Sequence, residues 1–171
     1  MAGTFMDTLP DDCSVDESSL ETYKYADMSR RELRSLIFHL LYAADAFEYQ
    51  DSLHAIVDRF NRGFDLDIPQ ESEVVSIAQA VIDNRDALDE QFKPYLHNWR
   101  FERIGLCTKL ILRMAFWEFN QKQIVSNIII NEAIELSKCF AEKDAYKFIN
   151  GILDEAAKEI GIPQETEAES E

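Results

Sequence analysis

Apolar residues recur every three or four positions along most of the chain, which is the spacing of amphipathic α-helices. Residues that disfavour helices interrupt the pattern and divide it into separate segments. Helices are predicted over residues 28–47, 50–60, 70–96 (as one helix or two), 106–119, 126–140 and 144–160. The pattern therefore predicts an all-α fold of about six to seven helices.

The first and fourth of these segments differ in how much of their surface is apolar. In the first, Ser29 is a suitable N-cap, because its hydroxyl can accept a hydrogen bond from an amide N–H of the first turn. Its buried stripe is expected to contain Leu33, Leu36, Ile37, Leu40, Leu41 and Ala44. The segment 106–119 is apolar almost all round, which predicts burial on most sides. We expect its polar members Arg113 and Glu118 to keep one edge in water.

Single residues are predicted to set several helix boundaries. Gly63 is the expected residue just after the second helix, Pro94 should end or kink the third, and Ser126 is a candidate N-cap. Asp144 lies in the first turn of the last helix, where its carboxylate can meet unpaired N–H groups. Gly151 lies in the interior of that helix, where glycine costs about 1 kcal/mol relative to alanine, so we expect another helix to approach closely there. The last helix should bury Phe148, Ile149, Ile152, Leu153, Ala156 and Ile160.

Arginines and aromatic residues alternate on one side of the first helix. At about 100° per residue, Arg31, Phe38 and Tyr42 share a stripe outside the core stripe, with Arg34 beside it and Arg30 nearer the core edge. Guanidinium groups bind phosphates and aromatic rings stack on bases, so this combination suits single-stranded RNA. The alternative is a solvated helix face with two partly buried rings.

The net charge of −16 over 171 residues is concentrated at the two ends. Residues 1–27 hold seven acidic residues and one lysine, and residues 163–171 hold four glutamates. Both segments are polar and lack periodicity, so we expect acidic disordered extensions on either side of a folded domain at residues 28–162. The extensions could simply aid solubility, or residues 1–27 could compete with RNA for the neighbouring arginines.

The sequence contains no recognisable catalytic, metal or cofactor motif. Its three cysteines, Cys13, Cys107 and Cys139, are scattered, which favours a reducing compartment such as the cytoplasm over a disulfide framework or zinc site. Asp51 and His54 have a metal-ligand spacing but no second pair accompanies them. Phosphate-binding glycine loops and nucleophile motifs are missing, and no apolar run approaches the roughly 20 residues needed to span a membrane. We therefore expect a protein that is not an enzyme and needs no cofactor.

The last two predicted helices resemble a known family. Residues 130–140 read INEAIELSKCF and residues 144–157 read DAYKFINGILDEAA, which is similar to the C-terminal signature of the NusB family of bacterial transcription antitermination factors. The run LILRMAFWEF at residues 110–119 matches the central helix of that family, and the resemblance covers about residues 29–160. It implies a helical bundle of two packed sub-bundles.

The resemblance also implies partners and binding residues. Members recognise boxA, a short single-stranded element of nascent ribosomal RNA, together with the ribosomal protein NusE, and the pair joins a complex on RNA polymerase. Glu32 and Ser35 interrupt the basic run that family members have at the first helix. Glu102 and Arg103, beside the central helix, are candidates for the NusE surface. The residues that would contact RNA are Arg30, Arg31, Arg34 and Tyr42 in the first helix and Lys143, Lys147 and Phe148 near the last.

A second hypothesis remains open at this point. NusB-like helical domains also precede the catalytic domain of some RNA cytosine methyltransferases, and no such catalytic domain is present here. The chain could therefore be a helical protein-interaction scaffold without RNA binding. The stripe of arginines and aromatic residues is the feature that favours the RNA-binding factor.

Overall fold

The computed structural model describes residues 24–163, and these form α-helices and short 3₁₀-helices but no strand. The α-helices are α1 (Arg30–Ala46), α2 (Leu53–Phe64), α3 (Glu73–Asp83), α4 (Arg85–Phe92), α5 (Leu106–Gln121), α6 (Ser126–Phe140) and α7 (Ala145–Ile160). The 3₁₀-helices are η1 (Tyr25–Asp27), η2 (Lys93–Leu96) and η3 (Phe101–Arg103). The predicted all-α class is confirmed, and none of these helices is both long and apolar enough to cross a membrane.

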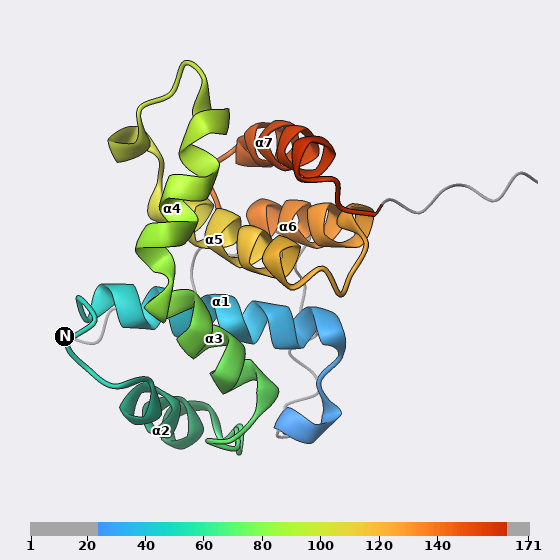
Figure 1. Cartoon of the computed structure of the whole chain (residues 1–171). Coiled ribbons are helices and arrows are strands. Elements are labelled where there is room, and N and C mark those ends of the chain that lie inside the picture. Colours follow the sequence, from blue (N-terminus) through green and yellow to red (C-terminus); the bar gives the residue numbers. More distant parts are fainter. Residues whose placement is uncertain (1–23, 164–171) are drawn as a thin grey trace, which may run out of the picture.

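The helices form two groups that share one core (Figure 1). Helices α1, α2 and α3 pack on one another in the lower half of the view, and α4 to α7 form the upper half. Helix α5 lies at the centre, where it contacts α4, α6 and α7 of its own group and α1 and α3 of the other. Its residues 110–116 are all buried, which confirms the expected burial on most sides. One continuous apolar cluster therefore joins the two groups.

The ends of the described region are fastened to the helices. The Tyr25 N–H donates a 2.8 Å hydrogen bond to the Leu66 carbonyl, and Lys24 forms ion pairs with Asp65 and Asp67. Residues 24–27, which the sequence places in the acidic extension, are thus attached to the helical region. At the other end, the Ser126 N–H donates to the carbonyl of Pro163 at 3.0 Å. The remainder of both predicted extensions, residues 1–23 and 164–171, lies outside the described residues.

Some predicted boundaries are confirmed and others are wrong. Pro94 follows the end of α4 and lies in the first turn of η2, as its missing N–H requires. Gly63 lies inside α2, and Asp65 takes the left-handed conformation that ends that helix. The reason is the next loop, where the Asn61 side chain bonds both the N–H and the carbonyl of Ile68. Ser126 is the first residue of α6 and not its N-cap, which is Val125; the Ser126 hydroxyl donates to the Pro163 carbonyl at 3.4 Å and caps no amide of the first turn.

The glycine in α7 contradicts our expectation of close helix packing. Gly151 is exposed, and a Cβ added to it would meet no atom within 4 Å. No neighbouring helix of the described chain therefore accounts for this glycine. Ile160, expected to be buried, is 36% exposed because α7 ends there.

Replacing Gly151 with alanine should raise the free energy of unfolding by about 0.5–1 kcal/mol, because alanine costs less backbone entropy in a helix and has room for its methyl group. Urea denaturation followed by helical circular dichroism measures the change. Gly161→Ala is the matched control and should lower stability, since Gly161 has a φ of +71° that only glycine adopts easily. A destabilised Gly151→Ala variant would contradict the open surroundings of this residue.

Candidate nucleic-acid interface

The first turn of α1 holds the predicted arginines in place. The Ser29 N–H donates to the Glu32 carboxylate at 2.7 Å, and the Glu32 N–H donates to the Ser29 hydroxyl at 3.3 Å. This capping box begins the helix where the serine predicted it. Glu32 interrupts the basic run in sequence, but its carboxylate is used at the helix N-terminus. Arg30 and Arg31 are both exposed.

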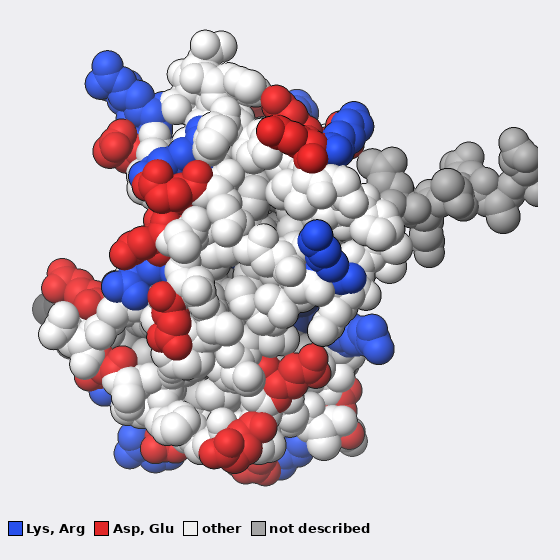
Figure 2. Space-filling view, viewed as in Figure 1, with Lys and Arg blue, Asp and Glu red and all other residues white. Residues whose placement is uncertain are grey.

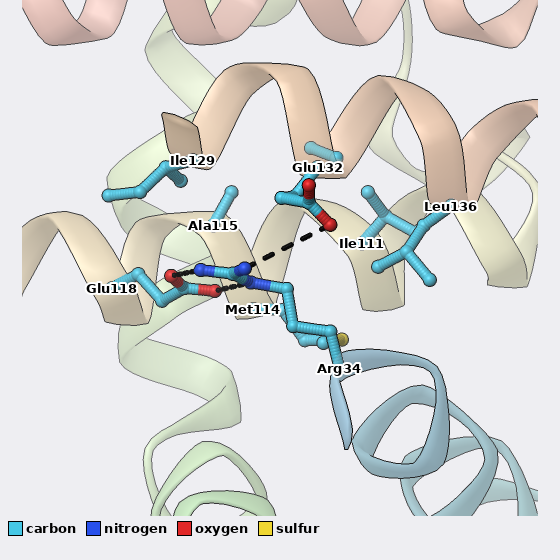
Figure 3. A pocket seen from close by; sticks show the side chains of 9 residues that line it. Arg34, Ile111, Met114, Ala115, Glu118, Ile129, Glu132 and Leu136 are labelled. Carbon is cyan, nitrogen blue, oxygen red and sulfur yellow. Dashed lines mark hydrogen bonds and ion pairs between the residues drawn. The ribbon is translucent and has the colours of Figure 1, made fainter. Parts of the chain in front are cut away.

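Arg31 and Arg34 differ sharply in their surroundings. The Arg31 side chain is 64% exposed and pairs with Glu132 of α6 at 3.1 Å. The Arg34 side chain is only 14% exposed, and its Nε and one terminal nitrogen donate to both carboxylate oxygens of Glu118 at 3.0 and 2.7 Å. Glu132 lies 3.9 Å from its other nitrogen, so a single guanidinium bridges α1, α5 and α6 (Figure 3). Arg34 is therefore an interior ion-pair partner, whereas Arg31 is reachable from solvent.

The charge of Arg34 is stabilised by its carboxylates. Burial alone would lower the pKa of Arg34, but hydrogen bonds and charge from Glu118, with the charge of Glu132, raise it above the ordinary value. Figure 3 shows the apolar residues around this pair, among them Met114 and Leu136. A charged pair in such surroundings is stable only while both partners are present.

Our expectation that Arg113 and Glu118 keep an edge of α5 in water is wrong. The Glu118 side chain is 15% exposed and engaged by Arg34. The Arg113 side chain is 11% exposed, and it donates two 2.7 Å hydrogen bonds to Asp89 of α4 and one of 3.3 Å to the Tyr49 hydroxyl. Arg113 and Glu118 therefore both form interior ion pairs that hold neighbouring helices.

The two aromatic residues of the α1 stripe, Phe38 and Tyr42, also differ in how far they are exposed. Phe38 was expected outside the core, but it is 2% exposed and stacks on Phe140 of α6 with ring centroids 4.8 Å apart. Tyr42 lies one turn further on and is 36% exposed. Phe38 thus fixes α1 against α6, and Tyr42 is the ring of this stripe that a ligand can reach.

The corner between α6 and α7 presents the predicted lysines. Lys143 and Lys147 are exposed, and Lys147 pairs with the Asp144 carboxylate at 3.1 Å. Asp144 is the N-cap residue of α7 and not part of its first turn; its backbone is left-handed and its side chain makes no capping hydrogen bond, so the carboxylate serves as a counter-charge to Lys147. Phe148 is partly buried.

The predicted residues of α1 and of the corner lie along one edge of the molecule. Arg31 pairs with Glu132, and Phe38 stacks on Phe140, so the two helices run side by side in the same direction. At 1.5 Å per residue these two contacts are about 10 Å apart along the helices. Tyr42 lies beyond Phe38, and the lysine corner lies beyond Phe140. The structure thus brings together two groups of residues that are remote in sequence.

The connector before α5 contains a ring that sequence reasoning did not select. Trp99 is 59% exposed, and its ring meets Phe148 at 5.4 Å in an edge-to-face arrangement. Glu102 and Arg103, the candidates for a partner surface, are exposed in η3 of the same connector. The signal for Trp99 was present, since a tryptophan beside Arg100 in a polar connector is unusual for a core residue.

The face shown in Figure 2 and the groove beside α1 both carry mixed charges. Figure 2 shows one face of the molecule, on which acidic and basic side chains are interspersed around a largely uncharged centre. A groove of about 630 Å³ lies between α1, α3 and α5, and its charged residues Arg30, Arg34, Glu73 and Glu118 balance one another. Neither the face shown in Figure 2 nor this groove therefore forms a broad basic surface.

Comparison with known proteins gives a consistent result. The model of the NusB family matches residues 31–158. A transcription antitermination protein NusB from Oleidesulfovibrio alaskensis is 38% identical over 143 residues, which cover 77% of this chain and 89% of that protein. The protein of the same name from Geotalea uraniireducens is 38% identical over 137 residues, covering 75% and 94%.

Solved structures agree with the sequence comparison. NusB of T. maritima superposes with a TM-score of 0.66 at 28% identity, covering 77% of this chain and 92% of that one. The solution structure of NusB from Aquifex aeolicus superposes with a TM-score of 0.58 at 19% identity, which concerns the fold alone. The matched region contains every helix from α1 to the last turn of α7.

Proposed function

Because this chain belongs to the NusB family of transcription antitermination proteins, we propose that it binds a boxA-like single-stranded segment of nascent ribosomal RNA as a complex with NusE. In this proposal it acts as a binding protein in the cytoplasm, without catalysis, and joins RNA polymerase through the antitermination complex. The finding that carries the proposal is the shared edge of α1 and α6. Two exposed arginines lie at one end of that edge, and Tyr42 and the lysine corner lie at the other.

The chemistry of this edge suits a single strand. Arg30 and Arg31 can contact phosphates, since the Arg31 side chain is 64% exposed and shares Glu132 with Arg34. Tyr42 and Phe148 offer aromatic surface for bases, and Lys143 and Lys147 add charge beyond them. A strand that follows the edge would meet these groups in turn.

Arg34 enters the proposal in a different role. Glu118 holds two nitrogens of its guanidinium through hydrogen bonds, and Glu132 lies 3.9 Å from the third, so a phosphate would compete with both carboxylates. We propose that Arg34 mainly positions α1 against α5 and α6, and so supports the exposed arginines one turn earlier. Glu102 and Arg103 in η3 are the proposed contacts for NusE, since both are exposed on the connector that adjoins Phe148.

Changing Arg30 and Arg31 together to glutamate should weaken binding of a boxA-like RNA and flatten its salt dependence. Each phosphate contact that is lost lowers the slope of log affinity against log salt by about 0.7 for a single strand. Fluorescence anisotropy titrations over a range of salt concentrations, with and without NusE, measure both quantities.

The matched control reverses Arg59 and Arg62 on α2, which are exposed on a different helix and give the same change in net charge. If both double variants lose affinity equally, the edge of α1 is not the binding site. If the unmodified chain binds NusE but not RNA, the protein-interaction scaffold is the correct function.

A further inference from the structure

An exposed indole projects from the connector between η2 and α5. Trp99 is 59% exposed although tryptophan has the largest apolar surface of any side chain, and much of that surface therefore faces water. Its ring contacts Phe148 at 5.4 Å with an interplanar angle of 61°. Phe148 in turn packs against the core, so the indole rests on a ring that is itself supported.

Contacts at both ends of this connector hold it near the α6–α7 corner and α7. His97 lies 2.8 Å from Glu155 of α7, and within the connector the backbone N–H of Trp99 donates to the Leu96 carbonyl at 2.8 Å. Glu142 of the corner accepts a 3.0 Å hydrogen bond from the Thr108 hydroxyl in the first turn of α5. A Cβ on Gly105 would lie 1.4 Å from the Glu142 carboxylate, so this glycine makes room for the contact. These contacts fix the backbone that carries the indole, and the ring itself rests on Phe148.

The surroundings of the indole favour a nucleic acid over an apolar partner. Arg100 follows it directly and is exposed, and Lys147 precedes Phe148 in α7 and is exposed too. The nearby acids are partly occupied, because Glu155 contacts His97, Glu142 accepts from Thr108, and Asp144 pairs with Lys147. A cation such as Arg100 beside a supported ring can bind a phosphate while the ring stacks the adjoining base.

We propose that Trp99, supported by Phe148, is a stacking site for one base of the bound single-stranded RNA. The inference rests on the proposed RNA binding and adds a residue and a chemical role to it. The site contributes to affinity through the face of a base and not through a phosphate, so it tolerates different bases at that position. It extends the binding edge from the lysine corner onto the connector that carries Glu102 and Arg103.

Trp99→Ala should weaken binding of a boxA-like RNA about 5- to 100-fold, the loss expected when one stacked base is released. Trp99→Phe should keep most of the affinity, because a smaller ring still stacks. Phe64→Ala is the matched control, since Phe64 is 62% exposed at the end of α2 and should have no effect on RNA. The salt slope of Trp99→Ala should equal that of the unmodified chain, because no phosphate contact is lost.

A series of RNAs with one abasic nucleotide each identifies the base. At a single position the abasic RNA and Trp99→Ala should each weaken binding, and together they should weaken it no further, since both remove the same contact. Additive losses at every position would overturn the stacking role. Unchanged affinity in Trp99→Ala, with the Arg30 and Arg31 double variant still impaired, would overturn this inference and leave the proposed function intact. Failure of the unmodified chain to bind RNA would overturn both.

Discussion

Replacing Asp89 with alanine should lower the free energy of unfolding by about 3–5 kcal/mol, because it leaves the Arg113 guanidinium buried without its counter-charge. The two side chains are 9% and 11% exposed and share two 2.7 Å hydrogen bonds. After the change, the 3.3 Å hydrogen bond to the Tyr49 hydroxyl would be the main remaining contact for the guanidinium. Urea denaturation followed by circular dichroism measures the loss.

Two controls separate the buried charge from the general effect of a substitution. Asp154→Ala removes the partner of Lys158 in a pair that is 46% and 63% exposed, and it should change stability by no more than about 0.5 kcal/mol. The double variant Asp89→Leu with Arg113→Met should recover much of the lost stability, since two apolar side chains need no counter-charge. If Asp89→Ala is as mild as Asp154→Ala, this pair does not hold α4 against α5.

The helices themselves could be predicted because each depends on contacts within a short stretch of chain. The stripe from Leu36 to Ala44 is buried as its spacing requires, and Ser29 begins α1 with Glu32 as its capping partner. The boundary at Gly63 was wrong because Asn61 bonds the backbone of the following loop, a contact that glycine statistics do not include. The local pattern therefore predicted which segments are helical more accurately than it predicted the residue at which each helix ends.

The interior polar contacts could not be predicted, since each joins residues from different helices. Periodicity places Glu118 at an edge of α5 and Arg34 at an edge of α1, but it cannot tell that the two edges meet. For the same reason Phe38 looked exposed, because its cover is Phe140 of α6. The site was predicted as a set of residue types, and the structure separates those that face solvent from those that hold the helices together.

Gly151 and Trp99 are two further positions whose surroundings the sequence did not reveal. A glycine inside α7 predicts close packing at Gly151, but the space around this residue is open. Trp99 belongs to no periodic apolar stripe and was not selected from the sequence, although its exposed ring beside Phe148 is a candidate binding feature. At both positions the residue type was informative, but how far the residue is exposed to solvent had to come from the structure.

The difference between Arg34 and Arg31 gives the second large effect. Arg34→Ala should lower the free energy of unfolding by about 3–5 kcal/mol, because Glu118 and Glu132 then remain close together in a part-buried site without the guanidinium that bridges them. Arg31→Ala should change it by about 0.5 kcal/mol or less, since that side chain is 64% exposed and its pair is screened by water. Both variants remove one arginine from the same helix, so they are matched in charge and position.

Binding to a boxA-like RNA should show the opposite order when it is measured well below the melting temperature of the weaker variant. Arg31→Ala should lose a phosphate contact and its share of the salt slope, whereas Arg34→Ala should keep the slope of the unmodified chain. Glu118→Ala tests the same assignment from the other side of the ion pair. In a double-mutant cycle Arg34 and Glu118 should be strongly coupled in stability, because each alone leaves a charge unpaired. If Arg34→Ala reduced the salt slope of RNA binding more than Arg31→Ala does, RNA would displace Glu118 and Arg34 would bind phosphate directly.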